Sequence, residues 1–422
     1  MISIKKLRSN PREIKELILR KGSNIDISKV INIDKNIRSL LDKGNKIRME
    51  VNRLSEQIGK AKKNNLDSKK EIKKSKALGK NLKKIDNELN TAKDSLNNML
   101  FNIPNLPHLS VPIGKNENQN KIIRYEGKKP QFSFKIKDHT ILGKDLELFD
   151  FISGAKLSGS GFPVYTNLGA LLERNLINSM INYHVDNYGY KEILPPVLMK
   201  KKSMITTGQL PKFQDDMYHT EIDNLYLAPT AEVPLTNIHR DEILDDKLLP
   251  INYVAYTPCF RREAGSYGKE THGLLRLHQF NKVELVKFSH PEKSYGDLEA
   301  LTKQAESILK ILGLHYRVIE LCTGDLSFAA AKCYDIEVWA PGEGKWLEVS
   351  SCSNFESFQA RRGNIRYRNG VNKKVGFLHT LNASGLATPR LMVALLETYQ
   401  TENGNIKFPS EVSNFLQFQE SI

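Results

Sequence analysis

The chain has 422 residues, enough for two or three domains that each bury a hydrophobic core. No apolar run approaches the roughly 18–20 residues that span a bilayer, and the first residues lack the apolar region of a signal peptide. We therefore expect a cytoplasmic protein with no membrane partner. The formal net charge of +15 favours an anionic partner, but lysine (45 residues) far exceeds arginine (18), so the distribution of charge must decide.

Cysteine usage argues against a metal or redox site. The four cysteines are scattered through the second half of the chain, at Cys259, Cys322, Cys333 and Cys352. Their spacing matches neither a zinc motif nor a redox pair, so reduced thiols and no structural zinc are expected.

Residues from about 28 to 100 have the pattern of two long helices. Apolar residues recur at alternating spacings of three and four over residues 30–61 and again over 78–99. A polar turn between them offers Asp67 or Ser68 as the N-cap of the second helix. The pattern predicts an antiparallel two-helix coiled coil, with helices of roughly 35 residues that are each about 50 Å long.

Positive charge gathers near the turn of this hairpin. Residues 60–84 contain eleven lysines and two acidic residues. Many such hairpins are dimerising or spacer coiled coils, but crowded like charges gain most beside a phosphate backbone, and helices can grip an RNA duplex by its shape. The candidate RNA-contacting lysines are Lys62, Lys63, Lys69, Lys70, Lys73, Lys74 and Lys76.

The prolines at 104 and 107 end the second helix, because proline cannot continue it. The polar stretch that follows predicts a linker, and beyond it the composition becomes more apolar. The expected domains are an N-terminal arm at 1–110, a linker at 111–130 and a second domain at 131–422. Within the second domain, residues 168–185 have helical spacing and the proline-flanked stretch 190–196 is typical of an edge strand.

The segment 257–284 predicts two strands joined by a basic, glycine-containing loop at 265–273. Arg261 and Glu263 are two positions apart, so on a strand they share one face. Three further residues, Arg276, Phe280 and Glu284, recur every four positions and would share a face as well. An arginine for phosphate, an aromatic ring for a base and an acid for an amino group suit a nucleotide and a small zwitterion. The plain alternative is an amphipathic hairpin with solvated charges.

The stretch FRREAGSYGKETHGLLRLHQFNKVE closely resembles motif 2 of class II aminoacyl-tRNA synthetases, in the version found in bacterial seryl-tRNA synthetases. The resemblance extends over essentially the whole chain. TGQLPKF at 207–213 and PTAE at 229–232 match that family, 168–196 resembles motif 1, and 380–390 resembles motif 3. The implied fold is α+β: an N-terminal antiparallel helical hairpin, then a class II catalytic domain with an antiparallel β-sheet flanked by helices.

The resemblance also implies a set of site residues. Catalysis is assigned to the charged residues Arg261, Glu263, Arg276 and Arg390. ATP binding is assigned to these four together with Arg262, Phe280, Glu348, Val349, Ser350 and Ser351. Serine binding is assigned to Thr230, Ala231, Glu232, Arg261, Glu284, Asn382 and Ser384. Mg²⁺ accompanying ATP is assigned to Glu348 and Ser351, where oxygen ligands suit a hard cation and would stabilise a glutamate expected to be buried.

The implied function is serine–tRNA ligation. Serine attacks ATP to give seryl-adenylate, and the seryl group passes to the 3′ end of tRNA(Ser), with tRNA(Sec) as a further candidate. Motif 1 implies a homodimer with tRNA bound across the subunits. Two alternatives stay open, an enzyme that loads an amino acid onto a carrier protein and a catalytically silent tRNA-binding or coiled-coil protein.

Three positions depart from the usual family pattern. Ala383 stands where glycine is more familiar, Thr388-Pro389 replaces a usual Val-Gly, and His272 replaces a usual arginine in the motif 2 loop. None of these removes a catalytic position. A proline in the first turn of a helix is tolerated, because the N–H there has no intrahelical acceptor.

Overall fold

The structure is a computed structural model that describes residues 1–264 and 272–422. The chain falls into a smaller helical unit and a larger α+β unit. Within the described ranges, none of the helices combines the length and the apolar character needed to cross a membrane. Most of the loop predicted at 265–273 lies outside the described residues.

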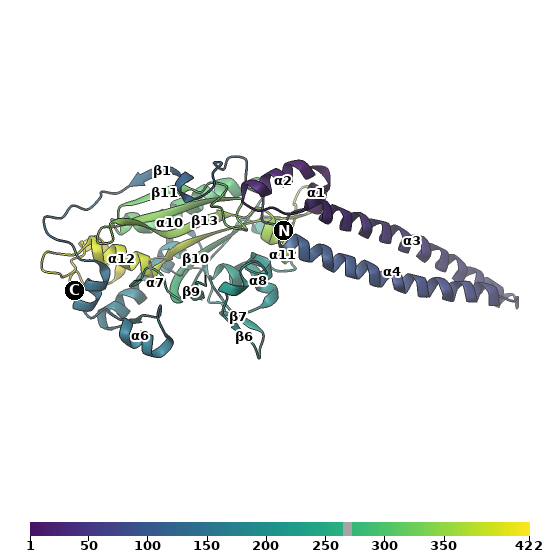
Figure 1. Ribbon diagram of the computed structural model, residues 1–422, viewed down its shortest axis with the longest axis horizontal. Helices are drawn as coiled ribbons and strands as arrows, with labels where there is room; N and C mark the ends of the chain where they lie inside the picture. The colour runs from purple at the N-terminus through teal and green to yellow at the C-terminus, as the bar shows by residue number, and fades with distance from the viewer. Residues whose placement is uncertain (265–271) are drawn as a thin grey trace. The chain divides into compact units, whose positions relative to one another are not determined.

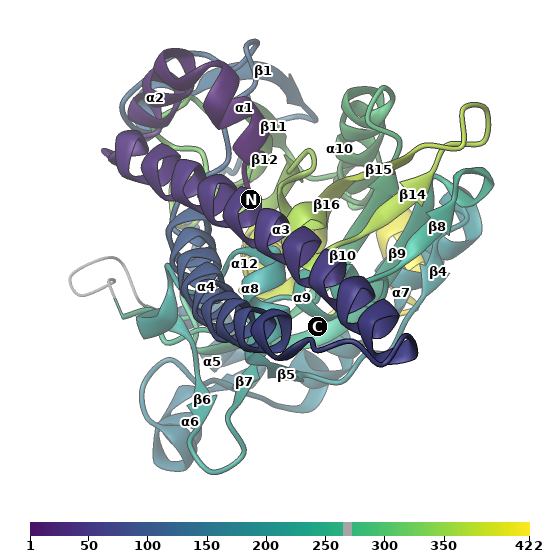
Figure 2. The same ribbon diagram turned by 90° about the vertical axis from the view of Figure 1, so that its right-hand side faces the viewer.

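The helical unit, Ile2–Leu19 with Ser23–Pro104, is built on two long antiparallel helices. Helix α3 (Ile27–Lys63) and helix α4 (Lys69–Phe101) lie side by side, as both views show (Figure 1, Figure 2). Apolar side chains from both helices meet in a buried seam that includes Ile37, Leu40, Ile85 and Leu89. The predicted antiparallel helical pair is therefore confirmed.

Local contacts explain how the hairpin begins and turns. Two short helices, α1 (Ile4–Ser9) and α2 (Pro11–Arg20), precede α3. Arg8 of α1 pairs with the buried Asp34 of α3 at 3.3 Å. At the turn, Asp67 Oδ1 accepts a hydrogen bond from the Lys69 N–H at 3.0 Å and so satisfies one of the free N–H groups of α4.

The larger unit is organised around a mostly antiparallel sheet with strand order β1-β11-β12-β13-β16-β10-β9-β4. Its pairs are antiparallel except β4 with β9. The strands are β1 (Lys121–Glu126), β4 (Lys191–Glu192), β9 (Ile251–Phe260), β10 (Gln279–Ser289), β11 (Tyr316–Glu320), β12 (Lys332–Ala340), β13 (Lys345–Asn354) and β16 (His379–Ala387).

Short strands and helices surround this sheet. The short strands are β2 (Phe149–Asp150), β3 (Val164–Tyr165), β5 (Leu198–Lys200), β6 (His219–Thr220), β7 (Leu225–Leu227), β8 (Ile243–Asp245), β14 (Arg366–Arg368) and β15 (Val375–Phe377). Figure 2 shows β8, β14 and β15 side by side. The helices are α5 (His139–Asp145), α6 (Phe151–Ser158), α7 (Asn167–Tyr188), α8 (Lys201–Thr207), α9 (Glu232–Asn237), α10 (Ser294–Ile311), α11 (Phe358–Gly363), α12 (Thr388–Thr398) and α13 (Ser410–Leu416), with 3₁₀ turns at Glu117–Gln119, Gln214–Asp216 and Asp246–Leu248.

Helices α7, α10 and α12 pack against the sheet and share its main hydrophobic core. Leu172 and Met180 of α7 are fully buried there, as their helical spacing predicted. The stretch expected to be a linker differs from its prediction. It contains β1, which pairs with β11 from Lys121↔Glu320 to Glu126↔Tyr316 at the edge of the sheet. An edge strand needs a partner on one side only, so it can be polar and still belong to the sheet.

Candidate active site

A cavity of about 700 Å³ is lined by residues of β10, β13 and β16 and by the segments that follow β9 and precede β10. Most of the predicted site residues line it, although they come from distant parts of the chain. They are Thr230, Glu232, Arg261, Glu263, Arg276, Phe280, Glu348, Val349, Ser351, Asn382, Ser384 and Arg390. The structure therefore brings the nucleotide-directed and serine-directed predictions into one cavity.

Four predicted residues lie outside this lining. Arg262 is exposed, and its guanidinium donates to the Asp215 carbonyl at 3.3 Å. Ser350 is buried and donates to the Ser384 carbonyl at 2.6 Å. Ala231 and Glu284 are fully buried. Only Glu284 among the four is hydrogen-bonded to side chains that line the cavity.

The charged residues Arg261, Glu263 and Arg276 lie beyond the ends of the strands, not on strand faces. β9 ends at Phe260 and β10 begins at Gln279, so Arg261, Glu263 and Arg276 all lie beyond the paired segment. Glu263 has a φ of 51°, a left-handed conformation that breaks the strand alternation on which the prediction rested. The expected shared strand faces are therefore wrong for these three residues.

The predicted side chains nevertheless converge. Arg276 Nη1 forms an ion pair with Glu263, across the ends of the two strands. The Arg261 guanidinium lies over the Phe280 ring, 5.2 Å from its centroid, and Arg261 Nε donates to the Pro229 carbonyl at 3.3 Å. This end of the cavity presents guanidinium groups and an aromatic ring, which suit phosphate and a nucleobase.

The polar end is centred on Glu284, whose side chain is fully buried. Its carboxylate contacts Lys282 Nζ at 2.5 Å and accepts from Asn382 Nδ2 at 2.8 Å and Thr230 Oγ1 at 3.2 Å. Lys282 Nζ also donates to Thr230 Oγ1 at 2.9 Å. Sequence reasoning did not identify Lys282, although its spacing of two from Glu284 places both on one strand face.

Glu232 adds a second buried carboxylate to this end. It accepts from Gln359 Nε2 at 2.5 Å and from Asn382 Nδ2 at 3.3 Å. Burial and, next, the charge of Glu284 raise the pKa of Glu232 to about 7. Gln359 is a further residue that the sequence did not reveal. Its position on α11 becomes meaningful only through the fold.

Glu348 differs from its prediction. It lies on β13 with 48% of its side chain exposed, not buried, and Arg390 Nη1 donates to its carbonyl at 2.9 Å. Asp335, which is opposite Ser351 on the neighbouring strand β12, is a partly buried acid close to Glu348. Burial and then the charge of Glu348 raise the pKa of Asp335 well above its usual range. Strand alternation alone cannot distinguish a strand face that borders a cavity from one that is buried in the core. The sequence therefore predicted burial for Glu348 and did not identify Asp335.

The departures noted in the sequence are accommodated. Pro389 occupies the first turn of α12, where it costs no hydrogen bond. Ala383 is fully buried opposite Cys352 of β13, so the fold has room for its methyl group. His272 Nε2 lies 2.9 Å from Glu343 Oε1.

The arm lysines are all exposed on α3 and α4. Lys74 already contacts Glu50 at 2.8 Å, so its charge is partly matched within the hairpin.

Comparisons with known proteins match both units. The family model of the seryl-tRNA synthetase N-terminal domain matches residues 1–107, and that of the class II tRNA synthetase core domain (G, H, P, S and T) matches residues 215–399. A serine–tRNA ligase from Thermodesulfovibrio yellowstonii is 49% identical over 99% of both chains, and one from Geobacter sulfurreducens is 48% identical over 99% of this chain and 98% of the relative.

Two solved structures share the fold over the full chain. Seryl-tRNA synthetase from Pyrococcus horikoshii, complexed with ATP, has a TM-score of 0.93 and 36% identity, covering 100% of this chain and 99% of that chain. The cytoplasmic serine–tRNA ligase from Naegleria fowleri, in complex with AMP, has a TM-score of 0.87 and 27% identity, covering 100% and 98%.

Proposed function

The chain belongs to the seryl-tRNA synthetase family, and we propose on that premise that it activates serine with ATP and transfers the seryl group to tRNA(Ser). The observation that carries this proposal is the two-ended cavity, with guanidinium groups and an aromatic ring at one end and two buried carboxylates at the other.

The decisive experiment is aminoacylation of unfractionated tRNA with ATP and each proteinogenic amino acid in turn. We expect charging with serine alone. Serine-dependent pyrophosphate exchange without charging would instead support a ligase for a carrier protein. Silence in both assays would support a non-enzymatic tRNA-binding protein and overturn the proposal.

The polar end is assigned to serine. The Glu232 carboxylate faces the substrate ammonium, and Glu284 accepts a hydrogen bond from the substrate hydroxyl. The remaining serine contacts come from residues that surround these two carboxylates, namely Thr230, Ala231, Arg261, Asn382 and Ser384. A site built to pair a hydroxyl rejects the analogue that lacks it by roughly 10⁴–10⁵, which excludes alanine.

The arginine end is assigned to ATP. Phe280 stacks on the adenine, and Arg261 holds the α-phosphate in line with the attacking serine carboxylate. Arg276 and Arg390 stabilise the charge of the leaving pyrophosphate, while Glu263 orients Arg276. Catalysis is positioning and charge stabilisation, without an enzyme nucleophile.

A magnesium ion is assigned to the edge formed by Glu348, Ser351 and Asp335. These side chains offer oxygen donors only, and a partly buried acid with a raised pKa gains from a nearby cation. When bound there, magnesium supplies positive charge to the phosphate groups.

The helical arm is assigned to tRNA. Its proposed boundaries are 1–110, and the catalytic domain is proposed at 131–422, with β1 of the intervening stretch completing the edge of its sheet. The candidate contacts are the exposed lysines of the hairpin, and tRNA(Sec) is a further candidate substrate. Neutralising the lysines from Lys69 to Lys76 with glutamine should weaken tRNA binding and reduce the salt slope by about 0.7–0.9 per lost phosphate contact. Adenylate formation should not change. Filter binding across a salt series tests this assignment, and an unchanged slope would contradict it.

The Lys74→Gln single variant is the matched control for that series. Because Lys74 already contacts Glu50, we expect it to change the salt slope less than Lys70→Gln does.

A cytoplasmic homodimer with tRNA bound across the subunits completes the proposal. A second cavity of about 400 Å³ lies along α7 and β4, lined partly by Tyr165, Glu173 and Leu194. Leu194 is 85% exposed, and among the described residues neither the Tyr165 hydroxyl nor Glu173 Oε2 has a hydrogen-bond partner. This surface suits a second copy of the chain. Light scattering should give twice the 48.0 kDa chain mass, and the chain mass itself would overturn the dimer.

A further inference from the structure

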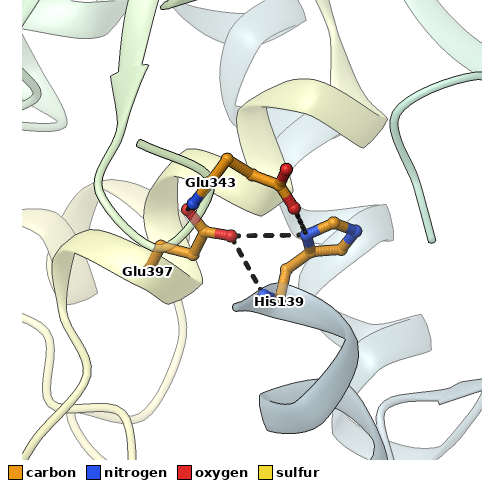
Figure 3. A group of neighbouring side chains, drawn as sticks. All are labelled: His139, Glu343 and Glu397. Atoms are coloured by element: carbon orange, nitrogen blue, oxygen red, sulfur yellow. Dashed lines mark hydrogen bonds and ion pairs between the residues drawn. The ribbon is translucent and has the colours of Figure 1, made fainter. Parts of the chain in front are cut away.

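Three side chains outside the cavity lining form a buried cluster (Figure 3). His139 begins α5, Glu397 lies in the last turns of α12, and Glu343 lies in the turn before β13. His139 Nδ1 lies 3.1 Å from Glu343 Oε1 and 3.3 Å from Glu397 Oε1. The side chains of His139 and Glu397 are fully buried, and that of Glu343 is 5% exposed.

The geometry first suggests a metal site, because the three ligand atoms lie within 4.8 Å of one another. The hydrogen bond at the second ring nitrogen, Nε2, argues against a metal site. His139 Nε2 accepts a hydrogen bond from the Leu274 N–H at 3.0 Å. A metal-bound neutral histidine carries its proton on the other nitrogen and donates with it, whereas here that nitrogen faces a donor. The proton therefore resides on Nδ1, between the two carboxylates.

Glu397 is satisfied in the same way, by N–H donors. Its carboxylate accepts from the backbone N–H groups of His139 at 3.0 Å, Gly342 at 2.9 Å and Glu343 at 3.1 Å. It thus ties the start of α5 and the 342–343 turn to α12. These contacts fix the orientation of the His139 imidazole ring, so that Nε2 points at the Leu274 N–H.

Leu274 belongs to the segment that carries Arg276. Leu274, Leu275 and Arg276 all line the active cavity. Gly273, just before them, has a φ of 59°, and a Cβ added there would overlap His139 Nε2. The backbone therefore lies directly against the imidazole, and glycine is required at this position.

Helix α12 holds this segment at two consecutive residues. Arg390 Nε donates to the Leu275 carbonyl at 3.2 Å, and Glu397 acts on the Leu274 N–H through His139. Arg390 and Glu397 are seven residues apart, close to two helical turns, so they lie on one side of α12. One helix thus fixes the position of the backbone that places Arg276 against Glu263.

We propose that His139 is a positioning residue for ATP, which locks the 273–276 segment to α12 so that Arg276 and Arg390 face the same phosphates. This inference rests on the proposed function, because it assigns a role within the adenylation site. His139 touches neither reacting atom and acts only through Leu274.

Two substitutions of His139 separate the contact that Nδ1 makes with the carboxylates from the hydrogen bond that Nε2 accepts from Leu274. The amide of His139→Asn reaches the position of Nδ1 and keeps the contact with the carboxylates, but it leaves Leu274 without an acceptor. The longer His139→Gln places its amide oxygen near Nε2 and restores that acceptor. In serine-dependent pyrophosphate exchange, we expect His139→Asn to raise KM for ATP about tenfold, the loss typical of one hydrogen bond, with KM for serine nearly unchanged. His139→Gln should recover part of this loss.

The control is His219→Asn, which changes an exposed histidine of β6 and should leave both constants at the wild-type values. Thermal unfolding is measured for every variant. An unchanged KM for ATP in a folded His139→Asn protein would overturn the proposal, as would equal changes in both KM values. Loss of exchange in the wild-type protein would instead overturn the proposed function.

A measurement on the wild-type protein keeps the inference testable if the variants do not fold. Nitrogen-15 NMR of labelled histidines should show one ring that carries its proton on Nδ1 and accepts a hydrogen bond at Nε2. A ring protonated on Nε2, or one metal equivalent per chain by mass spectrometry that is lost in His139→Asn, would refute the assignment.

Discussion

The two ends of the active cavity are built on different principles. At the serine end, Glu284 and Glu232 lie within regular elements, are buried, and are matched by neighbouring donors before substrate arrives. At the ATP end, Arg261 and Arg276 lie on turns beyond the strands and are only partly buried. Under the proposed assignment, selectivity for a small amino acid would depend on a buried, hydrogen-bonded network, whereas polyphosphate binding would depend on charges that can exchange partners.

The largest expected effect is at Glu284. Glu284→Ala should abolish serine activation, because it removes the hydroxyl acceptor and leaves Lys282 as an unpaired buried charge. ATP binding, measured by calorimetry, should stay within about twofold. Breaking a buried pair costs about 3–5 kcal/mol of folding stability, so thermal unfolding must be recorded alongside. Unchanged pyrophosphate exchange would remove Glu284 from serine recognition.

A conservative substitution at the same position distinguishes the role of the Glu284 charge from that of its oxygen acceptor. Glu284→Gln retains an oxygen acceptor without the charge, so exchange should be weakened but detectable. If it equals Glu284→Ala, charge and not hydroxyl pairing dominates this end of the cavity.

A smaller effect is expected at the ATP end. Arg276→Ala should lower kcat by about 10²-fold, the scale of losing one group that stabilises developing charge, while KM for serine changes little. Steady-state exchange at varied ATP and serine separates the two constants. A large rise in KM for serine would show that the two ends are coupled and would break the contrast between them.

The smallest effect is a pH dependence confined to the serine end. Burial beside Glu284 raises the pKa of Glu232 to about 7, so at pH 6 most of the free enzyme carries a neutral acid there. The ionised form that pairs with an ammonium appears as pH rises through about 7. KM for serine should therefore fall about tenfold between pH 6 and 8, and KM for ATP should not follow it.

The same linkage predicts a stability change of defined sign. Because the folded-state pKa is raised, Glu232 makes the protein less stable as pH rises from about 4.5 to about 7. Glu232→Gln should flatten both this trend and the serine profile. A wild-type KM for serine that is constant over pH 6 to 8 would contradict the assignment.

The sequence predicted what depends on local pattern. The spacing of apolar residues identified both arm helices, and the resemblance to the class II motifs identified twelve of the thirty residues that line the cavity. It missed partners that meet through the fold. Gln359 and Asp335 become significant only once α11 and β12 are placed beside the motif residues, whereas Lys282 shares a strand face with Glu284 and was overlooked.

Errors arose where a local rule was extended too far. Alternation along a strand was applied to Glu263 and Arg276, beyond the last paired residues. The same rule placed Glu348 in the core, although its strand face borders a cavity. The polarity of β1 resembled that of a linker because the strand lies at a sheet edge.

The ion pair between Arg276 and Glu263 affects which anions can bind to Arg276. The guanidinium is already neutralised by its own chain, so a passing monovalent anion must displace a tethered carboxylate to bind. A triphosphate brings several negative charges at once and, in the proposed assignment, engages Arg390 as well. The resting site would therefore favour a triphosphate over small monovalent anions.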